Sequence, residues 1–230
     1  MIAPHVKQFA FKLEQGKSLE FIPGQFITLQ VPAGDKTLRR SYSIASIPGQ
    51  DELLEFAAGY VENGPATQLL FNLAPGDEVQ AIGPAGRLIL REDEQPKRYV
   101  FAATSTGVTP FRSMLKQLEQ RLQTSDLKVV LLLGVQYRTD LIYGADFIEF
   151  ARRHPNFEFR AQYSRDALAH SLAFEHQGHV QLAFDELLLN PDQDIVYLCG
   201  NPNMIDQAYT KLQSLGFTTT QVRREKYISK

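Results

Sequence analysis

A short polar run in the first third of the chain carries three side chains with complementary chemistry. Arg40, Tyr42 and Ser43 stand close together in the sequence. An arginine can pair bidentately with a phosphate, a tyrosine ring offers a flat face for stacking, and a serine hydroxyl both donates and accepts hydrogen bonds. The set suits a flat cofactor that carries phosphate. On its own, the run is equally typical of the polar edge of a barrel strand.

Two further segments offer backbone amides to an anion. Gly64 to Thr67 opens a short helical pattern, and helix N-terminal amides bind phosphates; an ordinary helix cap is the alternative. Thr104 to Thr109 lies between an expected strand and helix, where open α/β sheets bind their ligands. Its hydroxyls suit a pyrophosphate, but Gly107 is its one glycine, so it is not the Gly-x-Gly-x-x-Gly fingerprint. A plain turn with a threonine cap is the alternative.

Two strand ends complete the candidate set. Ser164 and Arg165 follow an expected strand and could hold a terminal phosphate monoester, or could form a solvated turn. Cys199 and Gly200 end another strand. A cysteine there is most often a small buried apolar residue; alternatively its sulfur faces a ligand, and Gly200 lets a ring approach the backbone closely.

Composition limits what these segments can belong to. The 230 residues are 43% hydrophobic and 22% charged, which is typical of a globular protein of one large or two small domains. The net charge of −2 gives no strong field for nucleic acid. One cysteine, no signal-peptide pattern and no long apolar run predict a cytoplasmic protein without a membrane span. Cysteine and histidine spacing predicts no metal site.

Residues 1–94 are expected to form an antiparallel β-barrel. Short runs rich in β-branched and aromatic residues alternate with Pro, Gly and Asn turns. The expected strands are 21–31, 41–46, 53–61 and 78–82, and one helix is expected at 66–73.

Residues 95–230 are expected to form an α/β domain, after a polar linker at 91–97. Strands that alternate with helices predict a parallel sheet covered on both faces. The expected strands are 99–104, 128–134, 157–163 and 194–199, and the expected helices are 110–122, with Thr109 as N-cap, 145–153, 181–189 and 202–215.

The order of these segments resembles the ferredoxin–NADP reductase superfamily. Each motif is weak alone, but together they cover nearly the whole chain in the order of that family. They are Pro-Gly-Gln-Phe at 23–26, Arg-x-Tyr-Ser at 40–43, Gly-x-x-Thr at 64–67, Gly-Pro-x-Gly at 83–86, Thr-Gly-x-x-Pro at 106–110, Arg-x-Asp-Leu-x-Tyr at 138–143 and Cys-Gly-Asn-Pro-x-Met at 199–204.

The resemblance implies a flavoenzyme with FAD on the barrel. By analogy, Arg40 contacts the FAD pyrophosphate together with the turn around Thr67, Tyr42 stacks near the isoalloxazine, and Ser43 hydrogen-bonds near flavin N5. The nicotinamide nucleotide would cross the loop that contains Thr106, Gly107 and Thr109. Its nicotinamide would reach the flavin between Thr106 and Cys199, beside Gly200, so that hydride passes from nicotinamide C4 to flavin N5.

Five positions refine the analogy. Ser105 stands where family members commonly have glycine, which narrows the approach of a pyrophosphate. Tyr227 is the candidate to cover the flavin, and Glu225 is the candidate acid beside it, with three residues following at 228–230. Ser164 and Arg165 resemble the pair that binds the 2′-phosphate, which predicts NADPH over NADH.

The expected activity is electron transfer between NADPH and a small carrier protein, ferredoxin or flavodoxin. One cysteine cannot hold an iron–sulfur cluster, so a separate acceptor is required. The alternatives are a free-flavin reductase, the reductase subunit of a multicomponent oxygenase, or a non-catalytic electron-transfer subunit that binds nucleotide.

Overall fold

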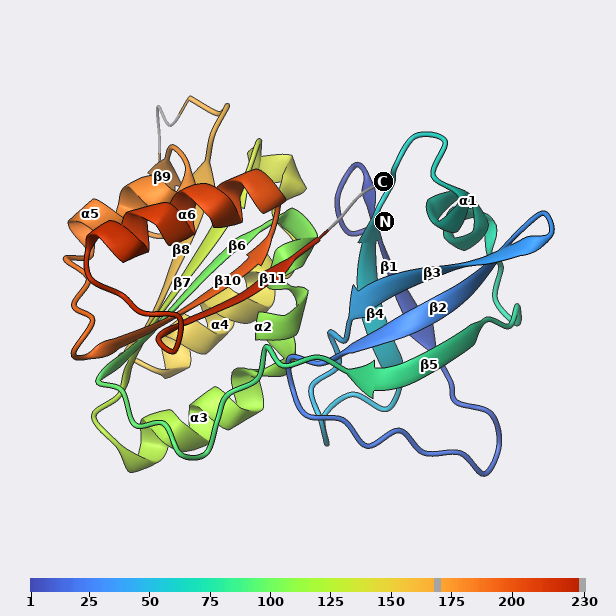
Figure 1. Cartoon of the computed structure of the whole chain (residues 1–230), viewed down its shortest axis with the longest axis horizontal. Coiled ribbons are helices and arrows are strands. Elements are labelled where there is room, and N and C mark those ends of the chain that lie inside the picture. The colour runs from blue at the N-terminus through green and yellow to red at the C-terminus, as the bar shows by residue number, and fades with distance from the viewer. Residues whose placement is uncertain (168–170, 228–230) are drawn as a thin grey trace.

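Two domains lie side by side in a computed structural model that describes residues 1–167 and 171–227 (Figure 1). The first carries antiparallel strands and the second a parallel sheet between helices. The predicted order, an antiparallel β domain and then an α/β domain, is confirmed. In the described part of the chain, no helix has the length and apolar character needed to cross a membrane.

The N-terminal domain packs two small antiparallel sheets around an apolar core. β1 pairs with β4, while β2 lies between β3 and β5. The core gathers aromatic and branched side chains such as Phe9, Ile27, Val31 and Phe56. The elements are β1 (Val6–Phe11), β2 (Phe26–Ala33), β3 (Lys36–Ser43), β4 (Leu54–Gly59), α1 (Pro65–Asn72) and β5 (Gln80–Ala85).

Two strand predictions here need correction. The first expected strand begins later, at Phe26, because Pro23 and Gly24 form a turn in which Gly24 has a φ of +100°. The second lies earlier, at Lys36–Ser43, because the chain leaves the sheet after Ser43. β1 was not predicted at all.

The C-terminal domain is a six-stranded parallel sheet in the order β11-β10-β6-β7-β8-β9. β6 is flanked by β10 and β7, so the strand order reverses beside it, and such a reversal is where open α/β sheets form a ligand crevice. The strands are β6 (Arg98–Thr104), β7 (Lys128–Val135), β8 (Phe157–Tyr163), β9 (Glu175–Gln177), β10 (Asp194–Gly200) and β11 (Val222–Lys226).

Helices cover both faces of this sheet, as predicted. Alternate residues of β6 and β7 face α3 and α4 on one side and α5 and α6 on the other (Figure 1). The helices are α2 (Thr109–Ser113), α3 (Leu115–Thr124), α4 (Gly144–Arg153), α5 (Ala183–Glu186) and α6 (Pro202–Ser214), with 3₁₀ turns at Ser105–Val108, Arg138–Asp140 and Val180–Leu182.

Two helix predictions differ from the structure. Thr109 does not cap the helix after β6, because a 3₁₀ turn precedes it and the helix is divided at Met114. The helix expected at 181–189 shrinks to a 3₁₀ turn and Ala183–Glu186, and Leu188 follows it with a φ of +46°, which helices do not accept.

One arginine joins the two domains. Arg112 of α2 donates from Nη1 to the Ala45 carbonyl of the first domain at 2.8 Å and pairs with Asp51 and Glu55, both at 3.2 Å. Its Nε also contacts Asp146 of the second domain at 2.6 Å. A single guanidinium therefore contacts carboxylates of both domains and helps to hold them together.

Candidate active site

A cavity of about 1060 Å³ lies between the two domains. Its first wall is built from β3, the end of β4 and the start of α1. Its second wall is built from the 3₁₀ turn Ser105–Val108, the carboxyl ends of β7, β8 and β10, and the start of α6. Small-molecule sites usually enclose about 300–1,000 Å³. The cavity therefore has room for a ligand of dinucleotide size.

The barrel wall presents the three side chains with which the sequence argument began. Arg40, Tyr42 and Ser43 all line the cavity from β3. The Tyr42 ring stacks on Phe56, with centroids 4.8 Å apart and planes inclined by 27°. Burial raises the pKa of Tyr42 to about 12, so it stays a neutral phenol. Backing by a buried ring holds Tyr42 flat against this wall, as stacking on a cofactor requires.

Beside them, the first turn of α1 faces the same cavity. The Thr67 hydroxyl donates to the Val61 carbonyl at 2.9 Å and accepts from the Val61 amide at 3.2 Å. Thr67 thus holds the loop 61–64 against the helix. Because its hydroxyl is engaged in these bonds, a pyrophosphate at this position would contact the backbone amides of the turn rather than the Thr67 hydroxyl.

Three predicted residues from opposite ends of the chain meet at the floor of the cavity. The Tyr227 hydroxyl donates to Ser43 Oγ at 2.7 Å, and Ser43 Oγ donates to Glu225 Oε1 at 3.2 Å. The Tyr227 amide also donates to the Gly200 carbonyl at 2.8 Å. The last strand, β11, therefore brings Glu225 and Tyr227 to the end of β3.

Burial controls the charge of this group. It raises the pKa of Glu225, although the hydrogen bond from Ser43 opposes the shift. It also raises the pKa of Tyr227 and, helped by the Glu225 carboxylate, that of Cys199. Tyr227 and Cys199 are consequently protonated at neutral pH, and Glu225 takes up a proton more readily than an exposed glutamate. The cluster can relay a proton at Ser43 Oγ.

Cys199 is completely buried and does not line the cavity, whereas Gly200 does. Gly200 has a φ of +123°, and a Cβ there would stand 2.5 Å from Thr104 Oγ1. Its backbone thus needs a glycine. The predicted role of Cys199 beside a nicotinamide stays a prediction; the structure places its side chain in the apolar core behind that strand end.

The loop after β6 divides into residues that face the cavity and residues that support it. Ser105 and Thr106 line the cavity, whereas Gly107 and Thr109 do not. A Cβ at Gly107 would stand 2.3 Å from the Cys199 carbonyl oxygen, and the Thr109 hydroxyl donates to the Thr106 carbonyl at 2.6 Å. Gly107 and Thr109 therefore shape the turn. Ser105 has a φ of +47°, a conformation that favours glycine.

At the outer end of the cavity, Ser164 lines the wall while Arg165 is exposed beside it. His179 lines the same region and was not singled out from the sequence, because a histidine with no partner at a regular spacing carries no pattern. Asn203 and Gln207 of α6 complete this end.

Comparisons with known proteins agree with this architecture. Residues 1–89 match the oxidoreductase FAD-binding domain family, and residues 101–210 match the oxidoreductase NAD-binding domain family. Ferredoxin--NADP reductase B of Sorangium cellulosum (strain So ce56) is 30% identical, over 98% of this chain and 93% of its own length. The toluate 1,2-dioxygenase electron transfer component of Pseudomonas putida is 31% identical, over 91% of this chain and 59% of its own length.

A solved structure has the same fold. The ferredoxin NADP+ reductase from Neisseria gonorrhoeae with bound FAD and NADP superposes with a TM-score of 0.82 at 24% identity, over 98% of this chain and 94% of that one. The chain belongs to the ferredoxin–NADP reductase family. It is a flavin oxidoreductase whose two domains bind FAD and a nicotinamide nucleotide, and the predicted fold, enzyme class and cofactors are confirmed.

Proposed function

We propose that the enzyme transfers electrons between NADPH and a small carrier protein, ferredoxin or flavodoxin. The observation that carries the proposal is the contact of Ser43 with Glu225 and Tyr227 at the cavity floor. FAD, when bound, supplies the redox chemistry, because a flavin exchanges hydride with a nicotinamide and single electrons with a carrier. The protein supplies alignment and a path for a proton.

The barrel residues would hold FAD as follows. Arg40 pairs with its pyrophosphate, assisted by the amides at the start of α1, where the hydroxyl of Thr67 keeps the turn in shape. Tyr42 stacks along its ring system. The donors and the flat surface present on this wall fit the cofactor.

The remaining residues act where the two cofactors would meet. Ser43 would hydrogen-bond to the bound flavin, and Glu225 would hold a proton within reach of Ser43 Oγ. Tyr227 would cover the flavin ring, and Gly200 would let the nicotinamide approach β10 closely.

The nucleotide wall would hold NADPH by its phosphates. Ser105 and Thr106 face the cavity beside the pyrophosphate position, and Ser164 with the exposed Arg165 stands at the outer end for the 2′-phosphate. The Arg165 side chain is long and exposed, so its guanidinium can contact the rim of the cavity although the residue does not line it.

The domain boundary near residue 94 and a cytoplasmic location both stay predictions.

Two observations support a carrier protein as the partner. The relative from Sorangium cellulosum, which matches over nearly its whole length, is named for ferredoxin. The chain also has one cysteine, too few to hold an iron–sulfur cluster of its own. Relatives named as oxygenase components make a multicomponent oxygenase the second candidate for the acceptor.

The test is anaerobic reduction of the FAD-loaded protein by NADPH, followed by addition of ferredoxin or flavodoxin. We expect the flavin absorbance to bleach with NADPH and to return when the carrier is added. No bleaching would favour the non-catalytic subunit, and loss of FAD during gel filtration would favour a free-flavin reductase. Return of the absorbance only with an oxygenase component would contradict the proposed carrier.

The same assay tests the cluster. Ser43→Ala should slow flavin reduction about 10- to 100-fold, the size expected for one hydrogen bond to a charged group. Ser46→Ala is the matched control: Ser46 is an equally buried serine that bonds only the Leu53 carbonyl and the Glu55 amide, outside the cavity. An equal loss in both variants would overturn the role of Ser43.

A further inference from the structure

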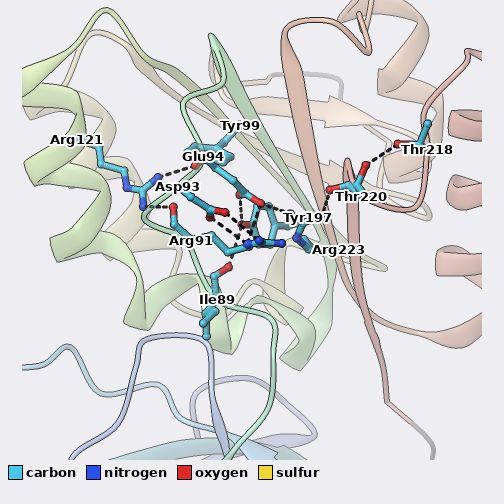
Figure 2. Close-up of polar contacts among 10 residues, drawn as sticks. All are labelled: Ile89, Arg91, Asp93, Glu94, Tyr99, Arg121, Tyr197, Thr218, Thr220 and Arg223. Atoms are coloured by element: carbon cyan, nitrogen blue, oxygen red, sulfur yellow. Dashed lines mark hydrogen bonds and ion pairs between the residues drawn. The ribbon is translucent and has the colours of Figure 1, made fainter.

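A second polar cluster lies away from the cavity, where the linker between the domains crosses the sheet. Figure 2 shows Arg223 and Tyr197 beside Glu94, Asp93 and Arg91 of the linker. Arg223 of β11 forms an ion pair with Glu94 of the linker and donates to the Thr220 carbonyl. The Arg223 and Glu94 side chains are only 14% and 10% exposed, so solvent screens the pair weakly.

The linker end of this ion pair is itself held in place. The Tyr197 hydroxyl donates to the Ile89 carbonyl at 3.0 Å and to Glu94 Oε2 at 3.4 Å. Arg121 donates to the Arg91 carbonyl at 2.8 Å (Figure 2). The linker is therefore bonded to β10 and α3 in the residues just before Glu94, and these contacts, with the one from Tyr197 to Glu94 itself, hold Glu94 where β11 can pair with it.

The other residue of the ion pair, Arg223, lies on the strand that leads to the active site. β11 is an edge strand that pairs with β10 alone. Arg223 and Glu225 lie two residues apart on it, and Tyr227 follows directly after its end, so the three lie on one side of the chain. With about 3.3 Å per residue, Tyr227 stands roughly 13 Å from Arg223. An edge strand has backbone hydrogen bonds on one side only, so side-chain contacts such as that of Arg223 with Glu94 add to the few interactions that hold β11 in place.

We propose that Arg223 is a positioning residue: its ion pair with Glu94 fixes β11 so that Glu225 and Tyr227 meet Ser43. The inference rests on the proposed function of that cluster. It predicts that loosening β11 at Arg223 misplaces Glu225 and Tyr227 while leaving in place the parts of the nucleotide wall at the turn Ser105–Val108 and at β7 and β8, with which β11 does not pair.

The first experiment follows the anaerobic rate of flavin reduction against NADPH concentration in Arg223→Met. We expect the limiting rate to fall about 10-fold or more, because small displacements at a reacting centre are costly, while half-saturation by NADPH changes less than about threefold. Arg223→Lys keeps the charge and should restore most of the rate. A rise in half-saturation with an unchanged limiting rate would overturn the proposal.

The matched control is Arg224→Met. Arg224 is the next residue on the same strand, but it is exposed and lies over the Tyr209 ring, with its guanidinium carbon 3.8 Å from the ring centroid. The same change of residue type there should leave the limiting rate within about twofold. If Arg224→Met slows the reaction as much as Arg223→Met, the effect belongs to the strand in general and the proposal fails.

A double-mutant cycle separates this inference from the function on which it rests. If Arg223 acts through Ser43, adding Arg223→Met to Ser43→Ala should cost less than about twofold more, since coupled residues are not additive. If the rate losses of the two single variants multiply in the double variant, Arg223 acts independently of Ser43 and the positioning role is overturned. Should Ser43→Ala alone leave the rate unchanged, the proposed function of the cluster fails instead. If Arg223→Met does not fold, Glu94→Gln removes the same ion pair, keeps an acceptor for Tyr197, and must show the same loss.

Discussion

The nucleotide-binding domain and the flavin-binding domain complete their cores in different ways. In the former, β6, β7 and β10 are buried along almost their whole length because helices cover both faces. In the latter, β3 and β5 are largely exposed, and the wall with Arg40 and Tyr42 faces the cavity. One domain is thus closed by its own chain, whereas the other offers a surface that a ligand must cover.

The contact between the domains follows the same division. The second domain supplies Arg112 to the carboxylates of the first, and it supplies Glu225 and Tyr227 to Ser43. The barrel mainly receives these groups. Three predictions test this contrast between the nucleotide-binding domain, whose sheet is covered by its own helices, and the flavin-binding domain, whose open wall depends on contacts from outside it.

The largest effect is expected where the two domains are joined. Arg112→Met leaves Asp51, Glu55 and Asp146 without their shared cation. Removing one partner of a buried ion pair costs about 3–5 kcal/mol; these carboxylates are 17–40% exposed, so solvent reduces the expected loss to about 3 kcal/mol. We expect calorimetry to show a lower melting temperature, with the barrel unfolding before the nucleotide domain. Arg152→Met removes an exposed pair with Glu149 and should cost less than about 1 kcal/mol. Equal losses, or a barrel that melts last, would contradict the contrast.

An intermediate effect is expected from the cofactor. FAD at about 100 times its dissociation constant should stabilise the protein by about 2.7 kcal/mol. Hydrogen exchange should show the gain in β3, the end of β4 and the start of α1, which line the cavity, and little change in α4. Protection that rises uniformly, or only in the nucleotide domain, would show that the barrel is not the dependent partner.

The smallest effect is expected at the rim of the nucleotide wall. Arg165→Ala removes an exposed cation, so NADPH efficiency should fall about tenfold, as for one hydrogen bond to a charged group, while NADH efficiency changes less than about twofold. Steady-state kinetics with both nucleotides measure this, with Arg152→Ala as an exposed arginine elsewhere. An equal loss for NADPH and NADH would remove Arg165 from the 2′-phosphate site.

The same contrast explains which elements the sequence could predict. β6, β7 and β10 are continuous apolar runs between helical patterns, so their type and order were predictable. β1, β9 and β11 were missed because edge strands such as Val-Arg-Arg-Glu-Lys carry little apolar alternation. A pattern of burial can identify a strand in the middle of a sheet far better than one at its margin.

The site divides in the same way. Spacing alone brought Arg40, Tyr42 and Ser43 together, because one strand carries all three. The meeting of Ser43 with Glu225 depends on how two domains pack, so only family resemblance suggested it. No local pattern could place Gly107 behind the turn, since its neighbour Cys199 comes from β10, whereas the bond of Thr109 to Thr106 is local.

The position of β11 at the margin of the sheet has a consequence for how the enzyme is made. All strand pairings of the barrel lie within residues 6–85, so this domain can fold while the rest is still being synthesised. Glu225 and Tyr227 reach Ser43 only after β10 is in place and β11 has been added beside it. On the proposed roles of Glu225 and Tyr227, the wall that would hold FAD is therefore synthesised before the groups that act on the flavin.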